Sequence, residues 1–168
     1  MTRTPRTAGA ATAALVAAVA LLVLTSGCAA VHQGDVQPAD VEKKGHAFVQ
    51  QTLAAIGSVT ATPRTAVFDE GWTKCATETP GQHRFDYSYA VRADVPAAKV
   101  KAALSAVKAE YLRHSYTLEY LPHPESGVSA TLPKSNWHFG VDASGTTTLS
   151  VSVDSDCVFT RHAPKTVK

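Results

Sequence analysis

The chain has 168 residues, of which 45% are hydrophobic, and this size is typical of a single domain with a buried core. Its sixteen Lys and Arg residues nearly balance its fourteen Asp and Glu residues. Two of the basic residues lie in the first 27 positions, so the other 141 residues carry no formal net charge with His neutral. This balance argues against a nucleic-acid partner, which requires a basic surface.

Residues 1–27 have the layout of a secretory signal peptide. Arg3 and Arg6 give a positive start, and residues 8–24 contain no charge. That stretch has 17 residues and is rich in Ala. It is short for a permanent membrane span, which needs about 20 apolar residues. Ser26 and Gly27 supply the small side chains that a signal peptidase requires, so we expect export and cleavage before Cys28.

The residues before Cys28 resemble a lipobox, the cleavage site of bacterial lipoprotein precursors. Gly27 and Ser26 match its small positions, whereas Thr25 stands where Leu is usual and Leu24 comes one place early. The resemblance implies that Cys28 receives a diacylglyceryl group on its sulfur and becomes the first residue. Two acyl chains give stable anchoring to a membrane. The alternatives are an ordinary secretory signal with a free Cys28, or an uncleaved anchor.

The first helix is predicted after a short tether. Residues 28–37 lack apolar periodicity, which indicates a tether between the lipid and the domain. Pro38 suits the first turn of a helix, and Gly57 is a plausible residue to end it. Gly45 lies inside this helix and lowers its stability by about 1 kcal/mol relative to Ala. A single apolar stripe predicts packing against a sheet.

Two or three strands are expected next. Residues 65–68 form a short candidate, Asp69-Glu70-Gly71 predicts a turn, and residues 72–77 resume as a strand that contains Cys75. Residues 83–92 give the clearest alternation of the chain, with Phe85, Tyr87, Tyr89 and Val91 on one face. Such a strand has one covered face and one solvated face.

A second helix and the remaining strands complete the domain. Asp94 is expected to cap the helix, which would end near Arg113 and His114. Alternation predicts further strands over residues 116–120, 128–132, 137–141 and 149–153, with a loop over 122–127 and a hairpin connection over 142–145. We expect a single α+β domain over residues 38–162, with two helices on one face of an antiparallel sheet, and a frayed end over 163–168.

Cys75 and Cys157 are expected to form a disulfide, because an exported chain meets an oxidising compartment. The closed loop of 83 residues would contribute roughly 4–4.7 kcal/mol as an upper guide. Zinc binding is disfavoured, since neither cysteine has another Cys or a His within four residues. We expect neither a metal nor another cofactor.

The signal and the two later cysteines together resemble the short lipoproteins of actinobacteria. The many Ala residues, the single Ile and the single Asn add to the likeness, although the signal carries nearly all of it. The resemblance implies a protein held on the extracytoplasmic face of the cell membrane by lipid on Cys28.

No catalytic motif is present: the chain lacks GxSxG, HExxH, a phosphate-binding Gly-rich loop and an EF-hand loop. We therefore expect a non-enzymatic domain that binds an unknown envelope protein or ligand. Most aromatic residues are expected in the core, and a possible binding surface contains Trp72, Trp137 and His138. One alternative is a carrier with an apolar cavity between sheet and helices. The other is an envelope hydrolase whose dispersed site would draw on His83, His123, His138, Asp86 and Glu119.

Overall fold

The computed structural model describes residues 36–76 and 84–168. The predicted signal peptide, Cys28, most of the tether and His83 lie outside these residues. Within the described part of the chain, no helix is long and apolar enough to cross a membrane.

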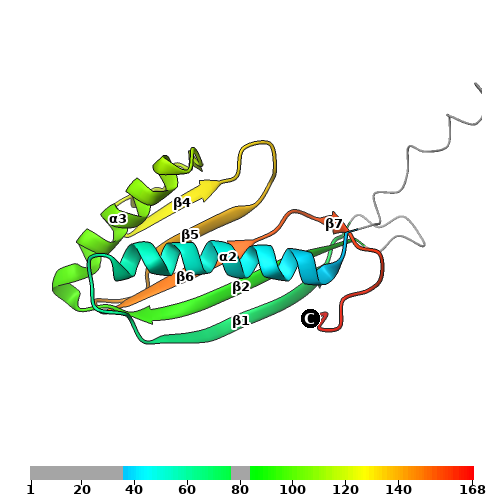
Figure 1. Cartoon of the computed structure of the whole chain (residues 1–168), viewed down its shortest axis with the longest axis horizontal. Coiled ribbons are helices and arrows are strands. Elements are labelled where there is room, and N and C mark those ends of the chain that lie inside the picture. The colour runs from blue at the N-terminus through cyan, green and yellow to red at the C-terminus, as the bar shows by residue number, and fades with distance from the viewer. Residues whose placement is uncertain (1–35, 77–83) are drawn as a thin grey trace, which may run out of the picture. The chain divides into compact units, whose positions relative to one another are not determined.

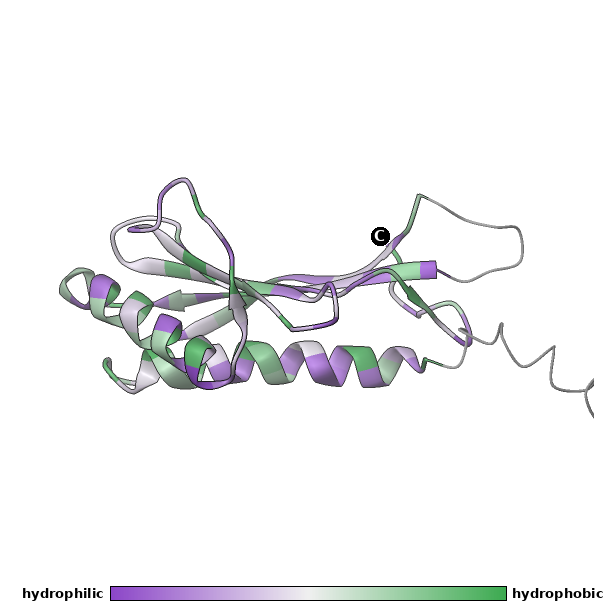
Figure 2. Cartoon of the chain, turned by 90° about the horizontal axis from the view of Figure 1, so that it is seen from above, coloured by the Kyte–Doolittle hydropathy of each residue, from purple (hydrophilic) through white to green (hydrophobic). Residues whose placement is uncertain are grey.

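The domain is a seven-stranded antiparallel sheet with two helices on one face, which confirms the predicted α+β architecture (Figures 1 and 2). The strand order is β1-β2-β6-β5-β4-β3, and β7 pairs with β2. The helices are α2 (Pro38–Gly57) and α3 (Val100–Arg113), the latter preceded by a 3-10 turn, Ala97–Lys99. The strands are β1 (Thr65–Lys74), β2 (Arg84–Asp94), β3 (Thr117–Leu118), β4 (Gly127–Thr131), β5 (His138–Ala143), β6 (Thr148–Asp154) and β7 (Val158–Phe159).

The core lies between the sheet and the two helices. Alternation along β2 and β6 turns their apolar side chains toward the helices, as the sequence predicts for β2. From α2, Phe48 stacks on Phe139 of β5 with ring centroids 4.6 Å apart. Tyr111 of α3 meets the same Phe139 ring edge-on at 5.1 Å. These rings fill the space between the layers.

The predicted turn at Asp69-Glu70-Gly71 is wrong, because β1 runs through it as one strand paired with β2. The register shifts between Val67 and Asp69, so a β-bulge takes the place of a turn. Tertiary contacts hold these turn-forming residues in the strand. Asp69 accepts a hydrogen bond from Ser88 on the open face at 3.0 Å, and Glu70 accepts one from Tyr87 on the helix-covered face at 3.0 Å.

Two boundaries in the second half also differ from the prediction. Asp94 does not cap a helix: it ends β2 opposite Thr148, and α3 begins only at Val100 with no side-chain cap. The strand expected over 116–120 is reduced to β3, because Tyr120 lies outside the sheet with 91% of its surface exposed.

The chain end is paired, although fraying was expected over residues 163–168. Trp72 N–H donates to the Thr166 carbonyl at 3.0 Å, and Lys168 N–H donates to the Trp72 carbonyl at 2.8 Å. Residues 166–168 therefore form a short parallel addition to the outer edge of β1. Trp72 is fully buried, so its outward backbone groups need partners from the protein itself.

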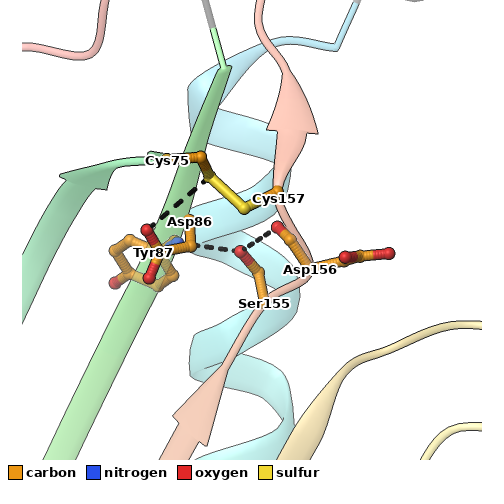
Figure 3. The surroundings of a disulfide bond; sticks show 6 residues. All are labelled: Cys75, Asp86, Tyr87, Ser155, Asp156 and Cys157. Atoms are coloured by element: carbon orange, nitrogen blue, oxygen red, sulfur yellow. Dashed lines mark hydrogen bonds between the residues drawn. A yellow bond between two sulfur atoms is a disulfide. The ribbon is translucent and has the colours of Figure 1, made fainter. Parts of the chain in front are cut away.

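The predicted Cys75–Cys157 disulfide is present, with its Cα atoms 6.3 Å apart (Figure 3). Cys75 follows β1 and Cys157 precedes β7, and these two strands pair with opposite edges of β2. The bridge therefore ties the two neighbours of β2 together. Beside it, Ser155 Oγ accepts from Tyr87 N–H at 2.8 Å and donates to the Asp156 carbonyl at 2.9 Å.

Candidate functional site

The binding surface predicted from Trp72, Trp137 and His138 does not form, because both tryptophans are buried. Trp72 lies opposite Tyr87 on the helix-covered face, and its indole N–H donates to Glu42 of α2 at 2.9 Å. The bulge explains this direction: one extra residue shifts the alternation of β1 and turns Trp72 inward. Trp137 packs against Phe48, with ring centroids 5.6 Å apart. Only His138 is exposed.

His138 does pair with a residue of the predicted hydrolase set. Its Nδ1 lies 2.8 Å from Glu119 Oε1, while Ser129 Oγ donates to Glu119 Oε2 at 2.5 Å. In a serine hydrolase the histidine stands between the serine and the acid, so that it can take the serine proton. Here the carboxylate stands between the other two. This order leaves Ser129 bound to an acid and not to a base.

The other described members of that set do not complete a catalytic group. His123 lies in a loop, 3.5 Å from Glu125. Asp86 and His138 share an open hollow of about 480 Å³ beside the disulfide. Among the described residues that line it, Ser155 alone bears a hydroxyl, and this hydroxyl is already engaged in two hydrogen bonds. Across residues 36–76 and 84–168, no three His, Cys, Asp or Glu side chains are placed to hold a metal ion.

A polar cluster that sequence reasoning missed joins α2 to the edge of the sheet. His46 Nε2 of α2 lies 3.0 Å from both Glu70 Oε1 of β1 and the Tyr87 hydroxyl of β2. The Tyr87 hydroxyl donates to Glu70 Oε1 at 3.0 Å. Burial, followed by the nearby Glu70 carboxylate, strongly raises the pKa of Tyr87, so the phenol stays protonated as a donor. The His46 ring also packs on Tyr89, with centroids 4.2 Å apart.

Beyond this cluster the first half of β1 is exposed. Residues 65–68 are exposed on both faces of the strand, and Val67 and Phe68 keep 55% and 45% of their surface in solvent. A groove of about 350 Å³ separates this end of β1 from α2. Val67 lies on the same face of β1 as Thr65, at the rim of the groove. We call it the α2–β1 groove, lined by Gln50, Leu53, Ala54, Gly57, Thr62, Pro63 and Thr65.

Sequence signals for this region were weak. Asp69-Glu70-Gly71 has the composition of a turn, so the sequence does not predict Glu70 as a strand residue of a polar cluster. The spacing of His46 in the sequence does not relate it to Glu70 or to Tyr87. The exposure of Val67 depends on the bulge in β1 and on the position at which α2 crosses the sheet, and neither can be predicted from the sequence.

No protein-family model, no curated protein and no solved structure matches the chain.

Proposed function

We propose that the chain is a lipid-anchored, extracytoplasmic protein of the cell envelope whose domain binds a partner without catalysing a reaction. The lipid is carried by Cys28. The partner binds at the α2–β1 groove and at Val67 on its rim. The observation that carries the binding proposal is the exposure of Val67, a large apolar side chain at the rim of this groove, with 55% of its surface in solvent.

The anchor is supported by the order of residues at the N-terminus. Arg3 and Arg6, the uncharged residues 8–24 and the small residues before Cys28 follow one another as in a lipoprotein signal. The disulfide uses Cys75 and Cys157, and the third cysteine of the sequence, Cys28, is the one at the lipobox position.

The binding surface is supported by its chemistry. Single exposed apolar residues are ordinary, but Val67 lies at the rim of a groove that contains Leu53 and Pro63. Phe68 lies on the opposite face, where the Arg92 guanidinium is 4.8 Å from the centre of its ring. Ligand sites combine apolar walls with a few polar groups that fix orientation. Glu70 provides such a group three residues after Val67 on β1, and its side chain remains partly exposed.

The two alternatives have less support. A hydrolase requires a base beside its nucleophile, and Glu119 separates Ser129 from His138. A carrier requires a cavity between the layers, where the rings of Phe48, Tyr111 and Phe139 are packed.

Site-specific crosslinking in intact cells tests the binding surface. A photoreactive residue would replace Val67 in one variant and Leu112 of α3, which is equally exposed at 55%, in the control. We expect one discrete crosslinked product from position 67 and none from position 112. No product from position 67, or the same product from both positions, would contradict the proposed surface.

A further inference from the structure

The last residues of the chain form a positively charged segment. Residues 160–168, here named the basic arch, contain Arg161, Lys165 and Lys168 and no acidic residue. Lys168 is neutralised, because its ammonium contacts Asp69 and donates to Ser88 Oγ at 3.2 Å. Arg161 and Lys165 are exposed, and neither has an acidic partner among the described residues. Two exposed cations without a described acidic partner therefore stand four positions apart in this segment.

The basic arch is fixed at both of its ends. Thr160 is buried and forms a parallel bridge with Val36, and Arg161 N–H donates to the Val36 carbonyl at 3.1 Å. The other end is held by the backbone bonds to Trp72. Figure 1 shows the chain end near the end of β1, and Lys168 contacts Asp69 and Ser88 on the open face of the sheet. Arg161 is thus held beside Val36, where the tether joins the domain, and Lys165 follows four residues later in the same segment.

The tether is short enough to keep this end near a membrane. Cys28 precedes Val36 by eight residues, which can span at most about 29 Å when fully extended. The opposite end of the domain is farther from the start of β2, since the eleven residues of this strand span roughly 33 Å.

We propose that the basic arch docks on the anionic headgroups of a phospholipid bilayer and so fixes the orientation of the anchored domain. This inference rests on the proposed lipid on Cys28. Each Lys or Arg near an anionic surface adds roughly a factor of five in binding, so two add about 25-fold. The attraction is screened over about 10 Å in 0.1 M salt, so it acts only when the arch reaches the surface.

This orientation has a consequence for the α2–β1 groove. Thr65 pairs with Ala93 near the far end of β2, whereas Lys74 pairs with Phe85 near the arch. The groove is lined by Thr65 and by Gly57 at the last residue of α2, so it belongs to the far end. Docking of the arch therefore presents the groove away from the bilayer, toward partners in the envelope.

Lysine footprinting of the membrane-extracted full protein tests the docking. The protein is reconstituted into vesicles of phosphatidylcholine alone, or of phosphatidylcholine and phosphatidylglycerol in equal amounts, and acetylated. Mass spectrometry then gives the reactivity of Lys165 relative to Lys99 and Lys101 at the far end. We expect roughly threefold lower reactivity of Lys165 on the anionic vesicles. We expect high salt to remove this difference in Lys165 reactivity between the two kinds of vesicle, and Arg161→Gln to reduce it. The control Lys99→Gln, with Lys101 as the reference, should leave the difference unchanged.

The other outcomes separate the two proposals. Equal reactivity of Lys165 on both vesicles, in protein whose mass includes the lipid, overturns the docking and leaves the anchor intact. Equal protection of Lys165 on neutral vesicles also overturns it, since no anionic lipid is then required. Protein that lacks the lipid mass overturns the anchor and the inference that depends on it.

Discussion

Gly45 of α2 lies against the ring of Tyr87 of β2, where a Cβ at position 45 would stand 2.8 Å from Tyr87 Cε1. The ring is buried, and its hydroxyl is bonded to Glu70 and His46, so it has little room to move aside. The glycine that weakens the isolated helix is therefore the residue that lets α2 approach the sheet.

Gly45→Ala is expected to destabilise the domain by about 1–2 kcal/mol, because the steric cost exceeds the gain of about 1 kcal/mol in helix propensity. Gly57→Ala is the matched control on the same helix. A Cβ there meets nothing within 4 Å, so we expect a neutral or slightly stabilising effect. Urea unfolding followed by circular dichroism measures both. A Gly45→Ala variant with a higher free energy of unfolding would contradict the expected steric cost of a Cβ against Tyr87.

Trp137→Ala is expected to cost about 3–5 kcal/mol, because the side chain is buried against Phe48. His138→Ala, one residue along, removes an exposed contact with Glu119 and is expected to cost less than about 1 kcal/mol. Thermal unfolding of the two variants separates the roles. A similar small loss of unfolding free energy in both variants would contradict the burial of Trp137 and would favour the exposed position that the sequence predicts.

Much of the fold follows from periodicity. The spacing of Val41, Phe48, Val49 and Ile56 predicts α2, and the alternation along β2 predicts its covered face, because both patterns are long and regular. The predicted turn at Asp69-Glu70-Gly71 does not form, because contacts of Asp69 and Glu70 with Ser88, Tyr87 and Lys168 outweigh the local preference for a turn. The bulge has no clear signal in the sequence, and it turns the Trp72 side chain toward the helices.

Removal of the disulfide by Cys75→Ser and Cys157→Ser together is expected to destabilise the domain by about 2–4 kcal/mol. The bond joins β1 to the segment before β7 across 82 positions of the chain, so its loss frees a large loop in the unfolded state. Chemical denaturation gives the change. Peptide mapping without reductant should find Cys75 and Cys157 in one linked pair, and two free thiols in exported protein would refute the pairing.

The paired chain end is expected to depend on pH through Asp69. The hydrogen bond from Lys168 lowers the pKa of this carboxyl below its ordinary value of about 3.9. A lowered folded-state pKa means that the contact stabilises the fold above the unfolded value and is lost as pH falls through the folded value. Hydrogen exchange of the Trp72 amide, which is bonded to Thr166, should be slow at neutral pH and faster in more acidic solution than its intrinsic rate predicts.

Asp69→Asn should remove this dependence and speed Trp72 exchange by up to about fivefold, the scale of one surface ion pair. Asp142→Asn, also on the open face of the sheet, is the control and should leave Trp72 exchange unchanged. Exchange as fast in the native protein as in an unpaired tail would mean that residues 166–168 fray, as the sequence suggested.

The candidate site could be predicted only in part. His138 and Glu119 were both in the set considered for a hydrolase, and they do meet, but the strand register inserts the carboxylate between His138 and Ser129. The α2–β1 groove depends on where a helix crosses a sheet. Gly45 packs closely on Tyr87 at this crossing, and no sequence motif marks the contact.

The central claim is that Cys28 carries a lipid that holds this domain at the membrane. Intact mass measurement of membrane-extracted protein, compared with Cys28→Ala, tests it most directly. We predict a wild-type chain that begins at Cys28 and carries added diacylglyceryl mass, and a Cys28→Ala variant that lacks the added mass and is not cleaved at this site. An unmodified wild-type protein recovered in the soluble fraction would contradict the account.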